Sequence, residues 1–400
     1  MLRSVNLLIA LTNLLLIHCL TGARHGQKEG YSELLGLWSS LNISLLPPLF
    51  FSSLLYYTDP LSTCLVLLTY TLHLSDRPLL AALAGAFSVL CRQTNIVWVF
   101  LAAAETAGQV LLEEVRAHQL RTKHPPTIPL TATGQLAELS QGLVQLIINP
   151  ILLARLVGLI VFRCIGYIIV GLAFLAFVHL NQGIVVGDRS AHVATIHLLQ
   201  LCYFSAFFLG LTLPWAVHHL RDFPRFLRQH PLVITLAVTV LACIIHWGTM
   251  AHPYLLADNR HFTFYLWRKV IMRHWTIKFL LIPIYILGFY HMARFIGISH
   301  LYCIEGQLLI LRSIRKTDLI FKLVVPPCIC LSVVPQLLLE FRYFVIPFLL
   351  LRSQIRPTSR LCLAAETLLL STVHFITIGL FLYRTFEWPS EPGVEQRFMW

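Results

Sequence analysis

The sequence is built from long apolar runs that follow one another along the whole chain. A helix that crosses the hydrocarbon core of a bilayer needs about 20 mostly apolar residues. Runs of this kind cover residues 2–20, 34–57, 61–75, 79–112, 156–180, 196–217, 232–250, 277–296, 319–338 and 361–383. Only 12% of the 400 residues are charged, against about a quarter in soluble domains. This pattern predicts an all-α polytopic membrane protein that forms one domain over residues 1–400.

The run 79–112 is too long for a single crossing. Arg92 lies near its middle, where a charge would be costly in lipid. We therefore predict two helices with a turn at residues 92–95, which gives about ten or eleven spans in total. With this split, Lys and Arg are concentrated in the loops on one side, and the positive-inside rule places those loops in the cytosol. They include a connector at 105–155, whereas the loops 181–195 and 251–276 are predicted to be lumenal.

The basic excess does not indicate nucleic-acid binding. Lys and Arg number 30 against 18 Asp and Glu, but they cluster beside apolar runs. No water-facing basic stripe with interleaved aromatic residues is apparent, so the lipid bilayer is the expected partner surface. The cysteines lie mostly inside apolar runs and lack zinc-ligand spacing. We expect no metal and no cofactor.

Polar residues gather at the predicted lumenal ends of the spans. Taken singly, they could be a loop ion pair, a snorkelling arginine or an interfacial aromatic belt. Because the predicted cytosolic loops carry no such clusters, we interpret them together as a polar, partly basic cavity at the lumenal surface. The expected site residues are Asp59, Arg92, Asn95, Asp188, Arg189, His192, Asp258, Asn259, Arg260, His261, Tyr265, Arg268 and Arg342.

The residue types in this cavity suit a lipid with a phosphate head. Arg and His donate hydrogen bonds to phosphate oxygens, and Arg matches them with a planar fork. The segment 257–269 is typical of an interfacial helix, with aromatic residues such as Tyr265 and Trp267 at headgroup depth. Asp59, Asp188 and Asp258 could orient hydroxyl groups. Composition thus indicates a membrane protein that handles lipid phosphates.

Six motifs carry a more specific signal. They are LYYTD, CRQTNIVWVF, GDRSAHVATIH, YLLADNRHFTFYLWRK, LLEFRYFVIP and the terminal QRFMW. In this order they resemble the family of endoplasmic-reticulum α-1,2-glucosyltransferases that add the third and last glucose to the dolichol-linked oligosaccharide. The resemblance runs from Met1 to Trp400. It implies a multi-span, lipid-linked (GT-C type) glycosyltransferase fold in the endoplasmic-reticulum membrane.

The resemblance also implies the substrates and the reaction. The donor would be dolichyl phosphate glucose, and the acceptor the diglucosylated oligosaccharide on dolichyl diphosphate, in the last step of assembly for protein N-glycosylation. An inverting displacement needs a carboxylate that takes the acceptor's proton and cations that stabilise the departing phosphate. Asp188, Asp59 and Asp258 are the candidates for the base. Asp188 is the first choice because Arg189 and His192, expected at the lipid phosphate, stand beside it.

The start of the chain departs from the family pattern. In the family, a further span and a lumenal loop with an acidic motif precede the stretch that matches MLRSVNLL. We therefore expect residues 1–400 alone to insert stably but to transfer no glucose at a useful rate, since loss of general-base help costs about a hundred- to ten-thousandfold.

Two alternatives to the enzyme remain open at this stage. The first is a non-enzymatic membrane subunit, for instance the regulator of an ion channel, which the missing acidic loop favours. The second is a lipid or sugar-phosphate transporter with the same cavity, because Arg163 lies within a predicted span.

Overall fold

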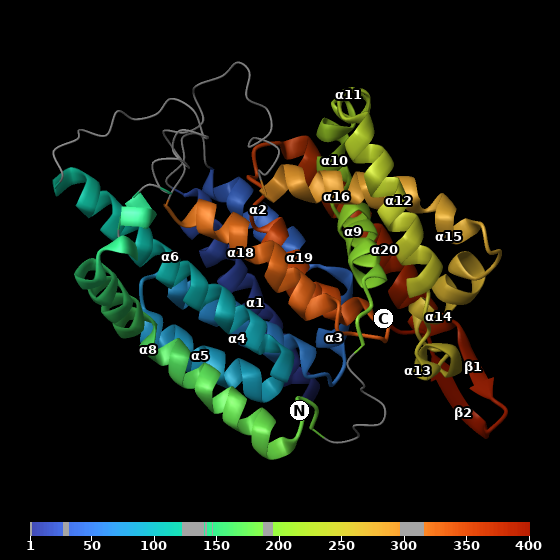
Figure 1. Cartoon of the computed structure of the whole chain (residues 1–400). Coiled ribbons are helices and arrows are strands. Elements are labelled where there is room, and N and C mark those ends of the chain that lie inside the picture. Colours follow the sequence, from blue (N-terminus) through green and yellow to red (C-terminus); the bar gives the residue numbers. More distant parts are fainter. Residues whose placement is uncertain are drawn as a thin grey trace. The chain divides into compact units, whose positions relative to one another are not determined.

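Most of the described chain is helical. The computed structural model describes residues 2–26, 32–121, 140, 142–145, 147–186, 195–296 and 316–400. The helices of the N-terminal half are α1 (Leu2–His25), α2 (Glu33–Ser44), α3 (Pro47–Leu54), α4 (Asp59–Leu74), α5 (Pro78–Cys91), the 3-10 turn η1 (Gln93–Asn95), α6 (Ile96–Arg121) and α8 (Pro150–Asn181) (Figure 1).

The C-terminal half adds shorter helices and one hairpin. Its helices are α9 (Leu199–Leu211), α10 (Leu213–Leu220), α11 (Phe223–Gln229), α12 (Pro231–Gly248), α13 (Pro253–Ala257), α14 (Phe262–Leu266), the π-helical turn η2 (Trp267–Ile271), α15 (Ile277–Leu280), α16 (Ile282–Ile296), α18 (Lys316–Val333), the 3-10 turn η4 (Phe341–Phe344), α19 (Val345–Arg352) and α20 (Arg360–Tyr383). Strands β1 (Thr385–Trp388) and β2 (Glu391–Arg397) pair antiparallel, a feature that the sequence did not predict.

The predicted polytopic membrane architecture is confirmed. Six helical segments of the described residues are long and apolar enough to cross a bilayer, or seven if the bent pair α2–α3 forms one span. They are Ser4–His25, Gln93–Val115, Pro150–Asn181, Pro231–Gly248, Ile277–Ile296 and Arg360–Tyr383. Other runs that were expected to span form shorter apolar helices, among them α5 and α9. The described residues therefore contain six or seven helical segments long enough to span, and the expected ten or eleven crossings stay a prediction.

The predicted break at 92–95 is confirmed. Helix α5 ends at Cys91, and α6 begins at Ile96 after η1. The expected connector at 105–155 is shorter than predicted, because α6 continues to Arg121 and α8 begins at Pro150. Glu113 and Glu114, which were expected in the connector, lie within α6. Residues 122–139 of the connector lie outside the described part of the chain.

The described residues group into two compact units, whereas the expectation of one domain over 1–400 stays a prediction. The first unit comprises Met1–Leu67, Gly187–Ile296 and Cys330–Trp400. In it, α1 packs against α2 and α3, and α9 packs along α16. Gly288 permits this α9–α16 contact, because a Cβ there would lie 2.6 Å from the Ser205 carbonyl oxygen. Phe208 of α9 lies 5.4 Å from Phe348 of α19, centroid to centroid, and fills the core beside it.

The second unit comprises Leu68–Val186 and Gly297–Ile329, with α5, α6 and α8 packed together. Gly166 of α8 lies so close to α5 that an added Cβ would be 2.8 Å from the Ala82 Cβ. Helices in lipid associate through such close contacts between small residues.

A buried polar cluster lies within this second unit. The Glu105 carboxylate is fully buried and accepts hydrogen bonds from the Tyr70 hydroxyl at 2.9 Å. His73 Nε2 lies 2.8 Å from a Glu105 oxygen. Because each group satisfies another, these side chains hold α4 against α6 where water is scarce. The sequence analysis did not identify this cluster.

Candidate functional site

The first unit contains two arginines that carboxylates hold in place. Arg342 lies in η4, and its Nε donates to Glu340 Oε2 at 2.9 Å, with a second bond from Nη2 to the same oxygen. Arg342 Nη1 lies 3.6 Å from Asp59 Oδ2, and the guanidinium carbon lies 5.4 Å from the centroid of the Tyr57 ring. Burial alone would lower the pKa of Arg342, but the charges of Glu340 and Asp59 raise it. The guanidinium therefore stays charged and fixed in direction.

Two asparagines of α1 fix the segment that carries Asp59. Asn6 Nδ2 donates to the Tyr57 carbonyl at 3.0 Å, and Asn13 Nδ2 donates to the Pro60 carbonyl at 3.2 Å. Both asparagine side chains are buried. These two polar residues of the first apolar run therefore hold the backbone on both sides of Asp59, where α4 begins.

The second pair is Arg260 with Asp258. Arg260 Nε donates to Asp258 Oδ1 at 2.9 Å, Nη2 donates to Oδ2 at 2.7 Å, and the Arg260 backbone N–H donates to Oδ1 at 3.0 Å. His261 Nε2 lies 3.6 Å from Asp258 Oδ2. Burial alone would raise the pKa of Asp258, but the hydrogen bonds from Arg260 and the neighbouring charges lower it overall. Asp258 is therefore ionised at neutral pH, with both oxygens engaged.

The C-terminal segment joins the two pairs. The Met399 N–H donates to the Arg260 carbonyl at 2.9 Å, and the Phe262 N–H donates to the Met399 carbonyl at 3.2 Å. The Tyr57 hydroxyl lies 3.6 Å from Met399 Sδ, and the Tyr57 ring carries Arg342. The terminal QRFMW motif was the sequence signal for this contact, but the sequence analysis gave it no role.

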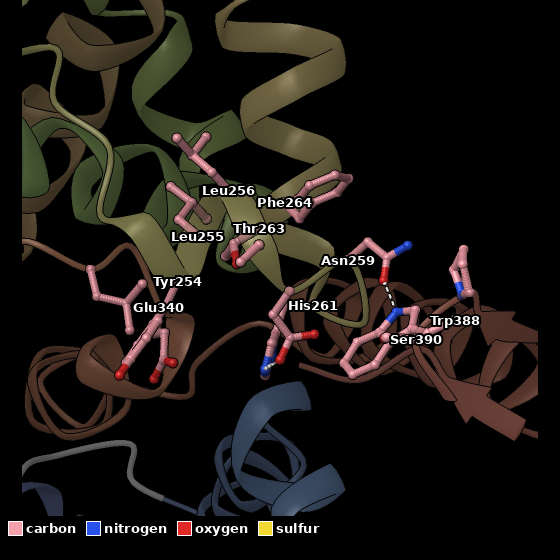
Figure 2. A pocket seen from close by; sticks show the side chains of 14 residues that line it. Tyr254, Leu255, Leu256, Asn259, His261, Thr263, Phe264, Glu340, Trp388 and Ser390 are labelled. Carbon is pink, nitrogen blue, oxygen red and sulfur yellow. Dashed lines mark hydrogen bonds and ion pairs between the residues drawn. The ribbon is translucent and has the colours of Figure 1, made fainter. Parts of the chain in front are cut away.

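A cavity of about 700 Å³ lies beside the Asp258–Arg260 pair. Figure 2 shows the side chains that line this cavity. They come from the loop before α14, from the segment before η4 and from the hairpin. Asn259 Oδ1 accepts a hydrogen bond of 2.6 Å from Trp388 Nε1. The polar and aromatic side chains of the lining include Tyr254, Asp258, Asn259, His261, Glu340 and Trp388. Glu340 and Trp388 were not among the predicted site residues.

Two predicted site residues belong to the second unit. Asn95 is buried in η1, and its Nδ2 donates to the Ser88 carbonyl at 2.9 Å. Arg92 has an extended backbone and ends α5. The Asn95 amide thus stabilises the turn between α5 and α6. The predicted residues Asp188, Arg189 and His192 lie outside the described residues.

The segment 257–269 is not one continuous interfacial helix. It forms α14 and then the π-helical turn η2, and Trp267 is only 5% exposed, so its ring is covered by protein. The place of these aromatic residues at headgroup depth stays a prediction. The Tyr265 ring lies 5.5 Å from the Phe398 ring of the C-terminal segment, centroid to centroid. Arg268 is exposed, and its guanidinium carbon lies 5.9 Å from the Phe264 ring centroid.

Proteins that share one name are similar to this chain along most of its length. A human protein named Dol-P-Glc:Glc(2)Man(9)GlcNAc(2)-PP-Dol alpha-1,2-glucosyltransferase is 34% identical over 405 residues, covering all of this chain and 80% of the relative. A Drosophila melanogaster protein of the same name is 34% identical over 366 residues, covering 90% of this chain and 74% of the relative. No solved structure matches the chain. The model of the DIE2/ALG10 family matches residues 1–353, and the chain therefore belongs to that family.

Proposed function

We propose that the protein transfers glucose from dolichyl phosphate glucose to the diglucosylated dolichol-linked oligosaccharide, forming an α-1,2 linkage at the endoplasmic-reticulum membrane. The names of the curated relatives support this activity. The structural observation that supports it is the pair of guanidinium groups, Arg342 and Arg260, each aligned by a carboxylate beside the cavity. Neither a channel-regulating role nor transport finds support among the relatives.

The two arginines would bind the donor's phosphate as it departs. Negative charge grows on that phosphate in the transition state, and donors that are already oriented stabilise it at little reorganisation cost. Glu340 and Asp59 hold Arg342, and Asp258 holds Arg260, so these three carboxylates are positioning residues.

The general base remains a separate question. Asp258 has both oxygens bonded to Arg260, and its lowered pKa makes it a poor proton acceptor. Asp59 Oδ2 lies 3.6 Å from Arg342, and we assign Asp59 to the positioning of that guanidinium. Of the three aspartates considered from the sequence, Asp188 stays the first choice for the base.

The proposed function is tested in cells that lack the final glucosyltransferase. Membranes carrying this chain receive synthetic donor and diglucosylated acceptor, and the lipid-linked oligosaccharide is sized. We expect triglucosylated product above the level in membranes without the chain, but at a rate lowered by about a hundred- to ten-thousandfold if no carboxylate of residues 1–400 acts as the base. Stable insertion with no triglucosylated product at saturating donor and acceptor would contradict the proposal.

The orientation gives a prediction of its own. A glycosylation acceptor inserted in the loop 181–195 should be modified, because we propose that this loop is lumenal, whereas one inserted at 118–135 should not. The measurement is the mass shift on glycosidase treatment. Modification of the second probe, or none of the first, would reverse the orientation.

Arg260→Lys is expected to slow glucose transfer by roughly ten- to a hundredfold, because an ammonium group cannot reproduce the bidentate fork. Arg228→Lys is the matched control, since Arg228 is exposed on α11 and its Nε donates only to the Pro224 carbonyl in the described contacts. Initial rates of both variants are compared at equal amounts of inserted protein. Equal rates would remove Arg260 from the phosphate site.

A further inference from the structure

The lining of the 700 Å³ cavity suits a neutral sugar better than a phosphate. Two carboxylates, Asp258 and Glu340, belong to it, whereas none of the described side chains in the lining is a Lys or an Arg. A phosphate in this cavity would meet hydrogen-bond acceptors and no described Lys or Arg of the lining, whereas sugar hydroxyls can donate to the carboxylates and to Asn259. The guanidinium groups of Arg260 and Arg342 are outside this lining although their neighbours belong to it.

Trp388 provides an aromatic wall whose orientation is already set. Its Nε1 donates to Asn259 Oδ1 at 2.6 Å, as Figure 2 shows, and the Arg260 guanidinium carbon lies 4.8 Å from its ring centroid. The side chain is half-buried and lines the cavity. The negative face of an indole attracts the weakly positive C–H groups on the flat side of a pyranose. A ring fixed in this way can bind a sugar with little loss of side-chain entropy.

The hairpin is built in a way that presents this ring. The pairing of β1 with β2 shifts register between Glu387 and Trp388. Irregularities of this kind bend a strand and redirect a side chain. Pro389 and Ser390 of the turn also line the cavity, so the whole tip of the hairpin faces the ligand space.

The charge pattern distinguishes the two substrates. The donor's glucose is joined directly to a phosphate, so it must lie next to the group that the two arginines are proposed to bind. The acceptor's terminal glucose is separated from its diphosphate by the other sugars of the oligosaccharide and is locally neutral. We propose that the cavity binds the terminal glucose of the acceptor, with Trp388 as its stacking surface. This inference rests on the proposed function and adds the place of the acceptor.

The test measures the binding of each substrate to the full chain in detergent micelles. For Trp388→Ala we expect the affinity for the diglucosylated dolichol-linked acceptor to fall about tenfold or more, as when an aromatic anchor is truncated. Affinity for dolichyl phosphate glucose should stay within about twofold of the unsubstituted chain, because Asp258 still holds the Arg260 guanidinium by two hydrogen bonds when the indole is removed. Trp388→Phe, which keeps an aromatic face, should restore most of the acceptor affinity.

Two further variants separate binding from folding. Val394→Ala alters an exposed side chain of the same hairpin outside the cavity lining, and acceptor binding should not change. Ser390→Trp would fill the cavity without removing the indole of Trp388, so it should weaken acceptor binding even if Trp388→Ala fails to fold. Unchanged acceptor affinity in Ser390→Trp, or a loss of donor affinity instead, would overturn the inference. An unsubstituted chain that binds neither substrate would contradict the proposed function itself.

Discussion

Arg342→Ala should lower the rate of glucose transfer by about a hundred- to a thousandfold, the range for removal of one preorganised donor to a developing negative charge. The expectation follows from geometry, because Glu340 and Asp59 already orient the guanidinium. Substitution removes both the charge and the fork that matches phosphate oxygens. The measurement is the initial rate at saturating donor and acceptor.

Two further variants show whether the effect is specific to the guanidinium of Arg342. Arg342→Lys keeps a positive charge and should give an intermediate rate, with a weaker contact to Glu340. Arg294→Lys changes an arginine that pairs with Asp222 at 3.4 Å on the surface, and the rate should not change. Thermal unfolding of each variant shows whether the fold is intact. A folded Arg342→Ala chain with an undiminished rate would show that the phosphate is bound elsewhere.

Arg352→Ala should lower the free energy of unfolding by about 3–5 kcal/mol, because it leaves the buried Glu366 carboxylate without its charged partner, with the neutral Asn42 amide still donating to it at 3.1 Å. Arg352 is fully buried, and its Nε and Nη2 donate to the two oxygens of Glu366 at 2.7 and 2.6 Å. The guanidinium carbon also lies 4.9 Å from the Trp215 ring centroid. The pair ties α19 to α20, and α19 follows directly after the turn that carries Arg342.

The control is a pair on the surface. Arg155 lies 3.4 Å from Glu114 and is half exposed, so Arg155→Ala should change the free energy of unfolding by about 1 kcal/mol or less. Replacing the buried partners together, as Arg352→Met with Glu366→Leu, should recover most of the stability, because no charge is then left without a partner. Unfolding is followed by denaturant titration in mixed micelles. A small loss for Arg352→Ala would mean that water or another group reaches Glu366.

The sequence predicted those features that depend on the cost of charge in lipid. The break between α5 and α6 follows from the length of the run 79–112 and from Arg92, because a mid-bilayer arginine is unfavourable whatever the tertiary structure. The grouping of Asp59, Arg342 and the 258–261 segment was also predicted, because each motif lies at the end of an apolar run. Both features depend only on local composition and on position along the chain.

Other features depend on contacts between distant segments and could not be read locally. Glu105 and Tyr70 each look like isolated polar residues in apolar runs, and only the packing of α4 on α6 brings them together. Trp388 precedes a Pro-Ser turn that suggests a loop, but its place in the cavity depends on a strand pairing and on Asn259, 129 residues away. The contact of Tyr265 with Phe398 likewise joins residues that are far apart in the sequence.

The backbone bonds between Met399 and the loop at Arg260 couple regions that are far apart in the sequence. An amide in such a bond exchanges its hydrogen with solvent only when the bond opens. Met399 donates to Arg260 and accepts from Phe262, so release of the last few residues would break both bonds. We therefore expect the Met399 and Phe262 amides to exchange at similar rates. The end of the chain thus supports the backbone of the loop in which Asp258 orients Arg260.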